Sequence, residues 1–247
     1  MVSFGPFTDV DDLRHPGTVE EWVFAAWTAG GDLGVLSGHR IVGRRAWYWA
    51  ALARRGHPLL HITDFEVPVR ADPFIVKGEA LWAEHTCDAP MEQWSIGNET
   101  YASAIEDTDD ALGLGYGTPT PIAFDLEWYA TAPPEPLQSL WPSPKNARSV
   151  APGATNEADF GTRPVGYEQA GVVHGAVEIL NESTVELAEV PAHRWHRWSA
   201  GTFGPLTLPE AVVHTGVRAP FTFPDGSVSD LVVTSGGWAR RADRRRA

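Results

Sequence analysis

The feature that most constrains this chain is a recurrence of short segments with strand-forming composition. These segments are rich in Trp, Val, Phe, Tyr and Ile and are bounded by Gly, Pro, Asp or Asn, whereas stripes with a helical period are scarce. The predicted strands are 22–29, 34–42, 46–53, 59–67, 75–87, 91–100, 122–130, 171–180, 183–187, 195–200, 211–217 and 228–234. Only 107–114 suggests a short helix. About a dozen short strands separated by turn residues predict an all-β sandwich or barrel.

Two segments indicate how the strands face the core. Strict alternation from 122 to 129 predicts that the apolar residues share one face of a strand and the polar residues the other. The first face holds Ile122, Phe124, Leu126 and Trp128, and the second holds Asp125, Glu127 and Tyr129. In contrast, 47–49 reads Trp-Tyr-Trp, with bulk on both faces. Such a strand fits a sheet that is covered on both sides, or a barrel wall sealed on its outside by a neighbour. A hairpin is predicted where Asn181 and Glu182 join 171–180 to 183–187.

The composition changes sharply between 131 and 164, where 7 of 34 residues are proline. Proline lacks the backbone N–H that a sheet ladder requires, so this segment is predicted to be a linker or lid. The expected organisation is an N-terminal β domain at 1–132, a Pro-rich linker or lid at 133–164, a smaller C-terminal β domain at 165–239 and a basic tail at 240–247.

Charge and hydropathy limit the classes of partner that this protein is expected to bind. The formal net charge is −13, and five arginines fall within the last eight residues. An acidic body repels phosphate backbones, so no nucleic-acid partner is expected. The longest apolar run, 46–53, is too short to cross a bilayer, and the N-terminus lacks a signal pattern. We therefore expect a cytoplasmic protein that does not insert into a membrane.

Specific chemical signatures are absent from the sequence. It contains no P-loop, no complete dinucleotide fingerprint, no nucleophile elbow and no H-E-x-x-H. Cys87 is the only cysteine, which excludes a disulfide framework and a cysteine-rich metal site. His193 and His196 have odd spacing, so in a strand they point to opposite faces and cannot share an ion. No metal site is expected.

Carboxylates and histidines beside tryptophans are the candidate chemical groups. Strand parity turns His85 to the same face as Leu81 and Ala83, either as a hydrogen-bonded core residue or as a catalytic group. The same parity aligns Glu92 with Trp94, where burial would raise the carboxyl pKa and make it a proton donor; the alternative is a solvent-facing carboxylate. Asp64, Glu66 and Glu127 belong to the same group.

The 11 tryptophans are the strongest compositional oddity. Their rings either fill a wide β core or line a concave site for a hydrophobic ligand, whose cationic character their faces would stabilise.

Several motifs resemble a two-domain lipocalin-like superfamily. It includes carotenoid 1,2-hydratases (hydroxyneurosporene synthases), AttH-like proteins and some Diels–Alderases. The similar segments are RAWYWAA at 45–51, LHITDFEVP at 60–68, ALWAEHTCDAPMEQW at 80–94, FDLEW at 124–128, and GYEQ at 166–169 before VHG at 173–175. The arginines at 194 and 197 stand where the family pattern differs.

The resemblance implies two packed calycin-like β barrels or sandwiches that hold a hydrophobic small molecule, with no organic cofactor. It also implies hydration, cyclisation or rearrangement of polyene-type substrates. The matched polar positions are Asp64, Glu66, His85, Glu92, Glu127, Tyr167, Glu168 and His174.

We therefore expect an enzyme that promotes hydration, cyclisation or isomerisation of an unsaturated polyene, polyketide or terpenoid. Glu92, Glu66 or Asp64 would donate a proton, while His85 or His174 would orient the donor or accept a proton from water. The expected substrate-binding residues are Trp49, Trp82, Trp94, Trp128, Tyr129, Glu127, Tyr167 and Glu168. The first alternative is a non-catalytic carrier of the same architecture. The second is a carbohydrate-binding module with an exposed tryptophan strip, against which the inward pattern of Trp128 argues. The oligomeric state is left open.

Overall fold

The computed structural model describes residues 7–30, 32–54, 57–105, 117–137, 165–199, 217–222, 224 and 228–233. Its elements are the short 3-10 helix η1 (Asp9–Asp12) and the strands β1 (Val19–Trp27), β2 (Leu33–Val42), β3 (Arg45–Arg54), β4 (Leu59–Pro68), β5 (Ile75–Lys77), β6 (Leu81–Ala89), β7 (Gln93–Ile105), β8 (Thr118–Ala130), β9 (Glu135–Pro136), β10 (Val165–Ile179), β11 (Val185–Ser199), β12 (Val217–Thr222) and β13 (Val228–Val233). Within these residues, no helix is long and apolar enough to cross a membrane.

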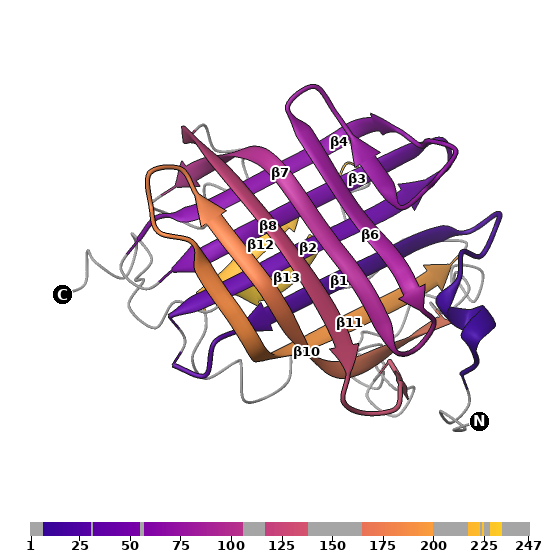
Figure 1. Cartoon of the computed structure of the whole chain (residues 1–247). Helices are drawn as coiled ribbons and strands as arrows, with labels where there is room; N and C mark the ends of the chain where they lie inside the picture. Colours follow the sequence, from indigo (N-terminus) through magenta and orange to yellow (C-terminus); the bar gives the residue numbers. More distant parts are fainter. Residues whose placement is uncertain are drawn as a thin grey trace, which may run out of the picture.

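An 11-stranded antiparallel sheet dominates the fold (Figure 1). Its strand order is β4-β3-β2-β1-β11-β10-β8-β7-β6-β5, with β9 paired to β10. The end of β7 also pairs with the start of β4, Leu59 opposite Ile105, so the sheet curves into a partial ring. The prediction of an all-β, barrel-like fold is confirmed.

Strands from both sides of the predicted linker share this sheet. β10 pairs with β8, and β11 pairs with β1, so the two late strands lie between two early ones. Residues 138–164, most of the predicted linker, lie outside the described residues. The domain boundaries at 132 and 165 stay a prediction, which the stability of a fragment of residues 1–132 can test.

Two predicted strand boundaries were wrong. The segment 75–87 is divided into β5 and β6 by a turn around Gly78, and the predicted strands at 183–187 and 195–200 fall, within 185–199, on one continuous strand, β11 (Val185–Ser199). Pro191 lies inside this strand, just beyond Ala192, where the pairing of β11 with β1 ends. Among the described strands, β10 alone pairs with β11 at Pro191, so the missing N–H breaks no ladder on the β1 side.

The β10–β11 hairpin is confirmed, and Asn181 in its turn adopts a φ of 64°. The predicted helix at 107–114 and nearly all of the predicted strand at 211–217 lie outside the described residues.

The main core fills the inner face of the curved sheet. The alternation predicted for β8 is confirmed, because Ile122, Phe124, Leu126 and Trp128 are all buried in this core. Gly171 on β10 lies under the Trp128 indole, and a Cβ at Gly171 would meet ring atoms at 2.4–2.5 Å. The glycine therefore creates the space in which the indole lies.

A second apolar cluster covers the outer face of β1–β3. Tyr48 belongs to the inner core, whereas its neighbours Trp47 and Trp49 belong to the outer cluster, together with Trp195. The β12–β13 hairpin lies against β2 and β3. The expectation that this part of the sheet is covered on both faces is confirmed.

Candidate functional site

A chain of hydrogen bonds runs through the interior from β7 to β2. Asn98 Nδ2 donates to the Tyr48 hydroxyl at 2.9 Å, and this hydroxyl lies 3.0 Å from that of Ser37. The Ser37 hydroxyl lies 2.8 Å from His85 Nε2, and His85 Nδ1 lies 2.7 Å from His39 Nδ1. All five residues are buried, because strand alternation turns them toward the inner core. We call these five residues the polar relay.

Each end of the relay has a buried polar atom without a hydrogen-bond partner among the described residues: His39 Nε2 and Asn98 Oδ1. When His85 Nδ1 donates to His39 Nδ1, His39 carries its own proton on Nε2; in the reverse arrangement Nε2 accepts. Buried polar atoms are normally satisfied by protein, water or ligand. The relay can therefore present either a donor or an acceptor to a molecule bound beside His39.

Aromatic rings surround the histidine end of the relay. Trp22 stacks on His39 with centroids 4.8 Å apart, and Phe74 approaches the same imidazole edge-on at 6.0 Å. Phe24 makes a similar edge contact with His85 at 5.1 Å. Burial lowers the pKa of His39 to about 3 and the pKa of His85 well below its ordinary value. Both imidazoles are therefore neutral near pH 7.

Asp64 is the predicted carboxylate that lies closest to this arrangement in the sheet. It is opposite Tyr48 in the β3–β4 ladder, and paired residues in a ladder project to the same face. Its Oδ2 lies beside Gly78, in the turn between β5 and β6. A Cβ at Gly78 would lie 2.7 Å from this oxygen. Burial raises the pKa of Asp64, which favours its protonated form.

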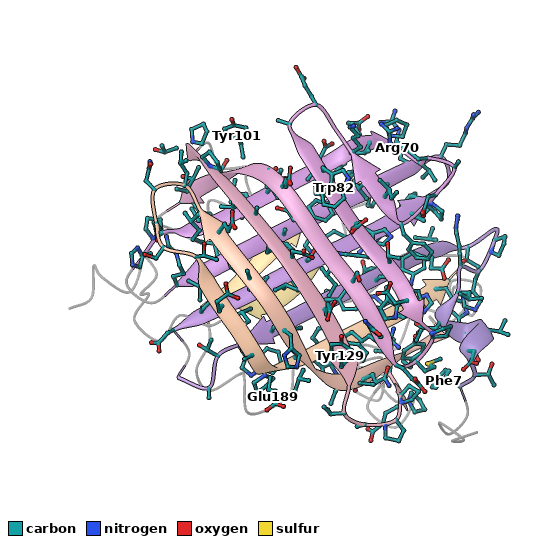
Figure 2. The ribbon with its side chains drawn as sticks, viewed as in Figure 1. Phe7, Arg70, Trp82, Tyr101, Tyr129 and Glu189 are labelled. Carbon is teal, nitrogen blue, oxygen red and sulfur yellow. The ribbon has the colours of Figure 1, made fainter. Side chains whose placement is uncertain are left out.

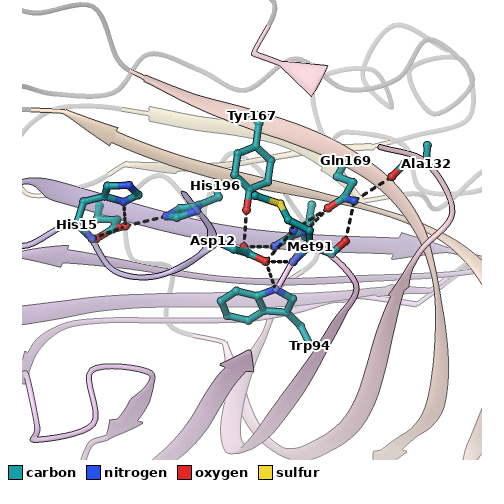
Figure 3. A network of polar contacts seen from close by, with 10 residues as sticks. Asp12, His15, Met91, Trp94, Ala132, Tyr167, Gln169 and His196 are labelled. Atoms are coloured by element: carbon teal, nitrogen blue, oxygen red, sulfur yellow. Dashed lines mark hydrogen bonds and ion pairs between the residues drawn. The ribbon is translucent and has the colours of Figure 1, made fainter. Parts of the chain in front are cut away.

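A buried ion pair crosses one end of the core, between η1 and β11 (Figure 3). Asp12 accepts from Arg194 Nη1 at 2.6 Å, from the backbone N–H of Met91 at 2.5 Å and from Trp94 Nε1 at 3.2 Å. The Tyr167 hydroxyl also donates to it. The guanidinium of Arg194 lies over Trp128, 4.8 Å from the ring centroid.

Gln169 completes this network. Its Oε1 accepts from Arg194 Nε at 2.9 Å, and its Nε2 donates to the carbonyls of Met91 at 3.0 Å and Ala132 at 2.9 Å. The opposing charges hold the pKa of Asp12 below its usual value despite burial. Because both charges are paired and hydrogen-bonded, this network is a structural tie between η1 and the sheet.

A third buried polar group joins the loop before β1 to β11. Glu20 Oε1 lies 2.8 Å from His15 Nδ1 and 2.8 Å from His196 Nε2. Glu20 and His196 are fully buried, and the His15 side chain is 24% exposed. In Figure 3, dashed lines mark the contacts of His15 and His196 with this carboxylate.

An open groove of about 1010 Å³ is lined by the β5–β6 turn, the β10–β11 turn and the parts of β7 and β8 between them. Trp82, Tyr101 and Leu180 give it an apolar surface, and Glu79 and Glu99 add negative charge. Thr100 also lines it and is two residues from Asn98 on the same strand, so the groove adjoins the Asn98 end of the relay.

The structure separates the predicted site residues between the two faces of the sheet wall. Those on the inner face are Asp64, which is half-buried, and His85, Trp94, Trp128 and Tyr167, which are buried. Trp49 is also buried, but in the outer cluster. Trp82 is half-buried and lines the groove (Figure 2).

Three other predicted residues meet on the outer face at the β8–β10 ladder. Glu127 pairs with His174 in register, and the Tyr129 hydroxyl donates to Glu127 Oε2 at 2.5 Å (Figure 2). The rings of Tyr129 and His174 meet edge-on at 5.7 Å. Nearby on β10, Glu168 pairs with His193, 3.2 Å away.

The expected burial of Glu92 against Trp94 was wrong. Glu92 is exposed because β7 begins at Gln93, so Glu92 lies in the preceding turn and strand parity does not extend to it. Glu66 is exposed as well and forms an ion pair with Arg45. These two carboxylates lack the apolar surroundings that would make a carboxylic acid a proton donor near neutral pH.

Sequence reasoning missed His39, Asp12, His15 and Glu20. His39 had a usable signal, since Val35, Ser37, His39 and Ile41 alternate on one face of a predicted strand. Asp12 and His15 had none, because they lie in a short helix and a loop whose positions depend on distant strands.

A family model matches residues 8–226. The chain belongs to this family, a domain of unknown function (DUF7064). The matched DUF7064 region runs from η1 through β12 and includes the relay, the Asp12–Arg194 pair and the His15–Glu20–His196 group. No curated protein matches the chain. The resemblance to carotenoid hydratases and AttH-like proteins stays a prediction.

Proposed function

We propose that this DUF7064 domain is a cofactor-independent enzyme acting on a hydrophobic, unsaturated small molecule of polyene, polyketide or terpenoid type. It would promote hydration, cyclisation or isomerisation. The observation that carries the proposal is the polar relay, which ends in the unpartnered Nε2 of His39 among aromatic rings.

An aromatic enclosure with few polar groups suits an oily ligand, because the apolar surface supplies affinity and the polar atoms fix orientation. A neutral imidazole that donates from Nε2 would polarise a carbonyl oxygen and stabilise negative charge that develops there. The neutral state follows from the burial that lowers the pKa of His39 to about 3.

Asp64 supplies a second group on the inner face. With its pKa raised by burial, it would donate a proton to one alkene carbon while water adds to the other. The added water then returns one proton to the Asp64 carboxylate. The groove lined by Trp82 adjoins the relay at Thr100 and offers a route for the ligand.

A second candidate is a non-catalytic carrier. The low pKa of His39 favours it, because an imidazole that stays neutral can hold a ligand by one hydrogen bond without exchanging a proton.

Native mass spectrometry of freshly purified protein, followed by analysis of the extracted small molecules, tests both candidates. The identified ligand is then incubated with the wild type, His39→Gln, Asp64→Asn and the exposed-site control His57→Ala. The enzyme proposal expects product from the wild type and the control, and bound but unconverted ligand with His39→Gln. Unchanged ligand with every protein would support the carrier.

The variant Glu92→Gln tests whether turnover depends on Glu92, the carboxylate first expected to be the acid, or on the inner-face groups His39 and Asp64. Loss of turnover in Glu92→Gln with full turnover in both His39→Gln and Asp64→Asn would overturn the assignment to the inner face.

A further inference from the structure

We propose that His15, Glu20 and His196 form a binding site for a divalent transition-metal ion, with zinc as the best-fitting class. Their three ligand atoms, His15 Nδ1, a Glu20 carboxylate oxygen and His196 Nε2, all lie within 4.8 Å of one another. The inference is independent of the proposed function, because none of these residues belongs to the relay.

The distances suit an ion after a small rearrangement, in which the two imidazole nitrogens move slightly away from the Glu20 oxygen. Zinc binds imidazole nitrogen and carboxylate oxygen at about 2.0–2.2 Å, which places neighbouring tetrahedral ligand atoms roughly 3.4 Å apart. The two imidazole nitrogens now lie 2.8 Å from Glu20 Oε1. An ion between them would replace the two hydrogen bonds, and the ring protons would move to His15 Nε2 and His196 Nδ1.

Surrounding contacts orient all three side chains. The backbone N–H of His15 donates to Glu20 Oε2 at 2.9 Å. Trp198 stacks on the His15 ring at 3.9 Å, and Trp22 stacks on the His196 ring at 4.8 Å. Such outer contacts fix ligand orientation and reduce the ordering that binding requires.

The local sequence explains why His15 is held there. His15, Pro16, Gly17 and Thr18 form a turn in which Gly17 has a φ of 88° and the Thr18 N–H bonds to the His15 carbonyl at 3.4 Å. Proline and glycine at the two central positions are typical of a type II turn. The Thr18 hydroxyl also donates to that carbonyl at 2.8 Å.

Two features favour a metal over a hydrogen-bonded group alone. Two histidines and one carboxylate are a donor set that zinc and other first-row ions accept, and three protein ligands leave a fourth position open. The His15 side chain is 24% exposed, which provides an entry path for an ion from solvent. In addition, His196 Nδ1 is buried with no partner among the described residues, so it is free to take the ring proton when Nε2 ligates.

Zinc titration into chelator-treated, tag-free full-length protein tests the site by calorimetry. The expected result is one zinc ion per chain, with affinity reduced at least tenfold in His15→Ala and Glu20→Gln. The control His57→Ala removes an exposed histidine outside the site and should bind as the wild type does.

Circular dichroism verifies that each variant is folded. If Glu20→Gln does not fold, His15→Ala decides, because His15 lies in a loop and is partly exposed. Visible absorption of bound Co²⁺ gives a second readout, which should disappear in His15→Ala. Absence of saturable binding, or equal zinc affinity in the wild type and His15→Ala, would overturn the site. Neither measurement uses substrate, so the result is separate from the proposed activity.

Discussion

Arg194 carries a full charge in the buried interior. Its side chain is 1% exposed and lies among Trp94, Trp128 and Tyr167, with Asp12 and Gln169 as polar partners. A buried ion pair that is fully hydrogen-bonded contributes modestly to net stability. Removal of one partner is strongly destabilising, because the other charge is then buried without compensation.

Arg194→Met should therefore lower the free energy of unfolding by about 3–5 kcal/mol, because Asp12 would be left buried without its counter-charge. Urea denaturation measures the change. Asp12→Asn combined with Arg194→Met should recover part of the loss, and Arg45→Ala, which removes an exposed ion pair with Glu66, should cost less than about 1 kcal/mol. Equal losses in Arg194→Met and Arg45→Ala would refute this account.

The buried imidazoles make stability depend on pH. In the unfolded chain His39 takes up a proton as pH falls below its ordinary pKa of 6.5, whereas in the fold it stays neutral until about pH 3. The contribution of the neutral His39 to the free energy of unfolding is therefore fully present above pH 6.5. It is lost as the pH falls, by about 1.4 kcal/mol per pH unit for one such site. The groups that set this pKa besides burial are His196 and Arg14, which lower it, and Glu21, which raises it.

Denaturation curves of the wild type and His39→Gln between pH 7.5 and about pH 5.5 check this, since most carboxylates remain ionised in that range. The wild type should lose stability more steeply than the variant. If the stability of the two proteins changed equally with pH, His39 would have the same pKa in the folded and the unfolded state, contrary to this prediction.

At the scale of single elements, β10 shows how a strand is adapted to one neighbouring ring. Gly171 leaves room for Trp128, and Gly175, with a φ of 133°, lies where β10 shifts register against β11. A Cβ at Gly175 would lie 2.0 Å from the Asp125 carbonyl oxygen. At both positions a neighbouring group lies so close to the backbone that a Cβ would overlap with it.

Gly171→Ala should destabilise the protein by about 1–3 kcal/mol, because the added methyl overlaps the Trp128 indole in a filled core. Chemical denaturation gives the energy, and near-ultraviolet circular dichroism reports the displaced indole. Trp128→Phe in the same background should reduce the penalty by vacating space. Wild-type stability in Gly171→Ala would show that the indole moves freely.

Sequence patterns predicted the elements where alternation was strict and failed where partners came from elsewhere. The four inward residues of β8 and the orientation of His85 followed from parity alone. The continuity of β11 through Pro191 depends on which strands flank it, which no local pattern encodes. For the same reason, the meeting of His15 with His196 and of Asp12 with Arg194 could not be predicted, since each joins a loop or short helix to a distant strand.

At the scale of the molecule, the sheet order is the feature with the widest effect. β1 and β8 belong to the first 132 residues, yet both depend on β10 and β11 for one of their edges. A ring built this way buries its inner core only when the late strands are in place.

A fragment of residues 1–132 should therefore fail to show a cooperative unfolding transition, because β1 and β8 would each expose an unpaired edge. Thermal and urea melts monitored by tryptophan fluorescence make the measurement, with the full chain as control. A cooperatively folded, monomeric fragment would instead establish the N-terminal unit as a domain of its own.

The pairing of β1 with β11 also has a consequence during synthesis. Val19 lies opposite Ser199, so β1 leaves the ribosome long before β11 and must wait until nearly the whole sheet has been translated before it meets its second neighbour. Closure of such a long loop is slow, and the waiting strands are open to association with other nascent chains. Translation speed and chaperone supply, more than intrinsic stability, should govern the yield of folded molecules in a cell.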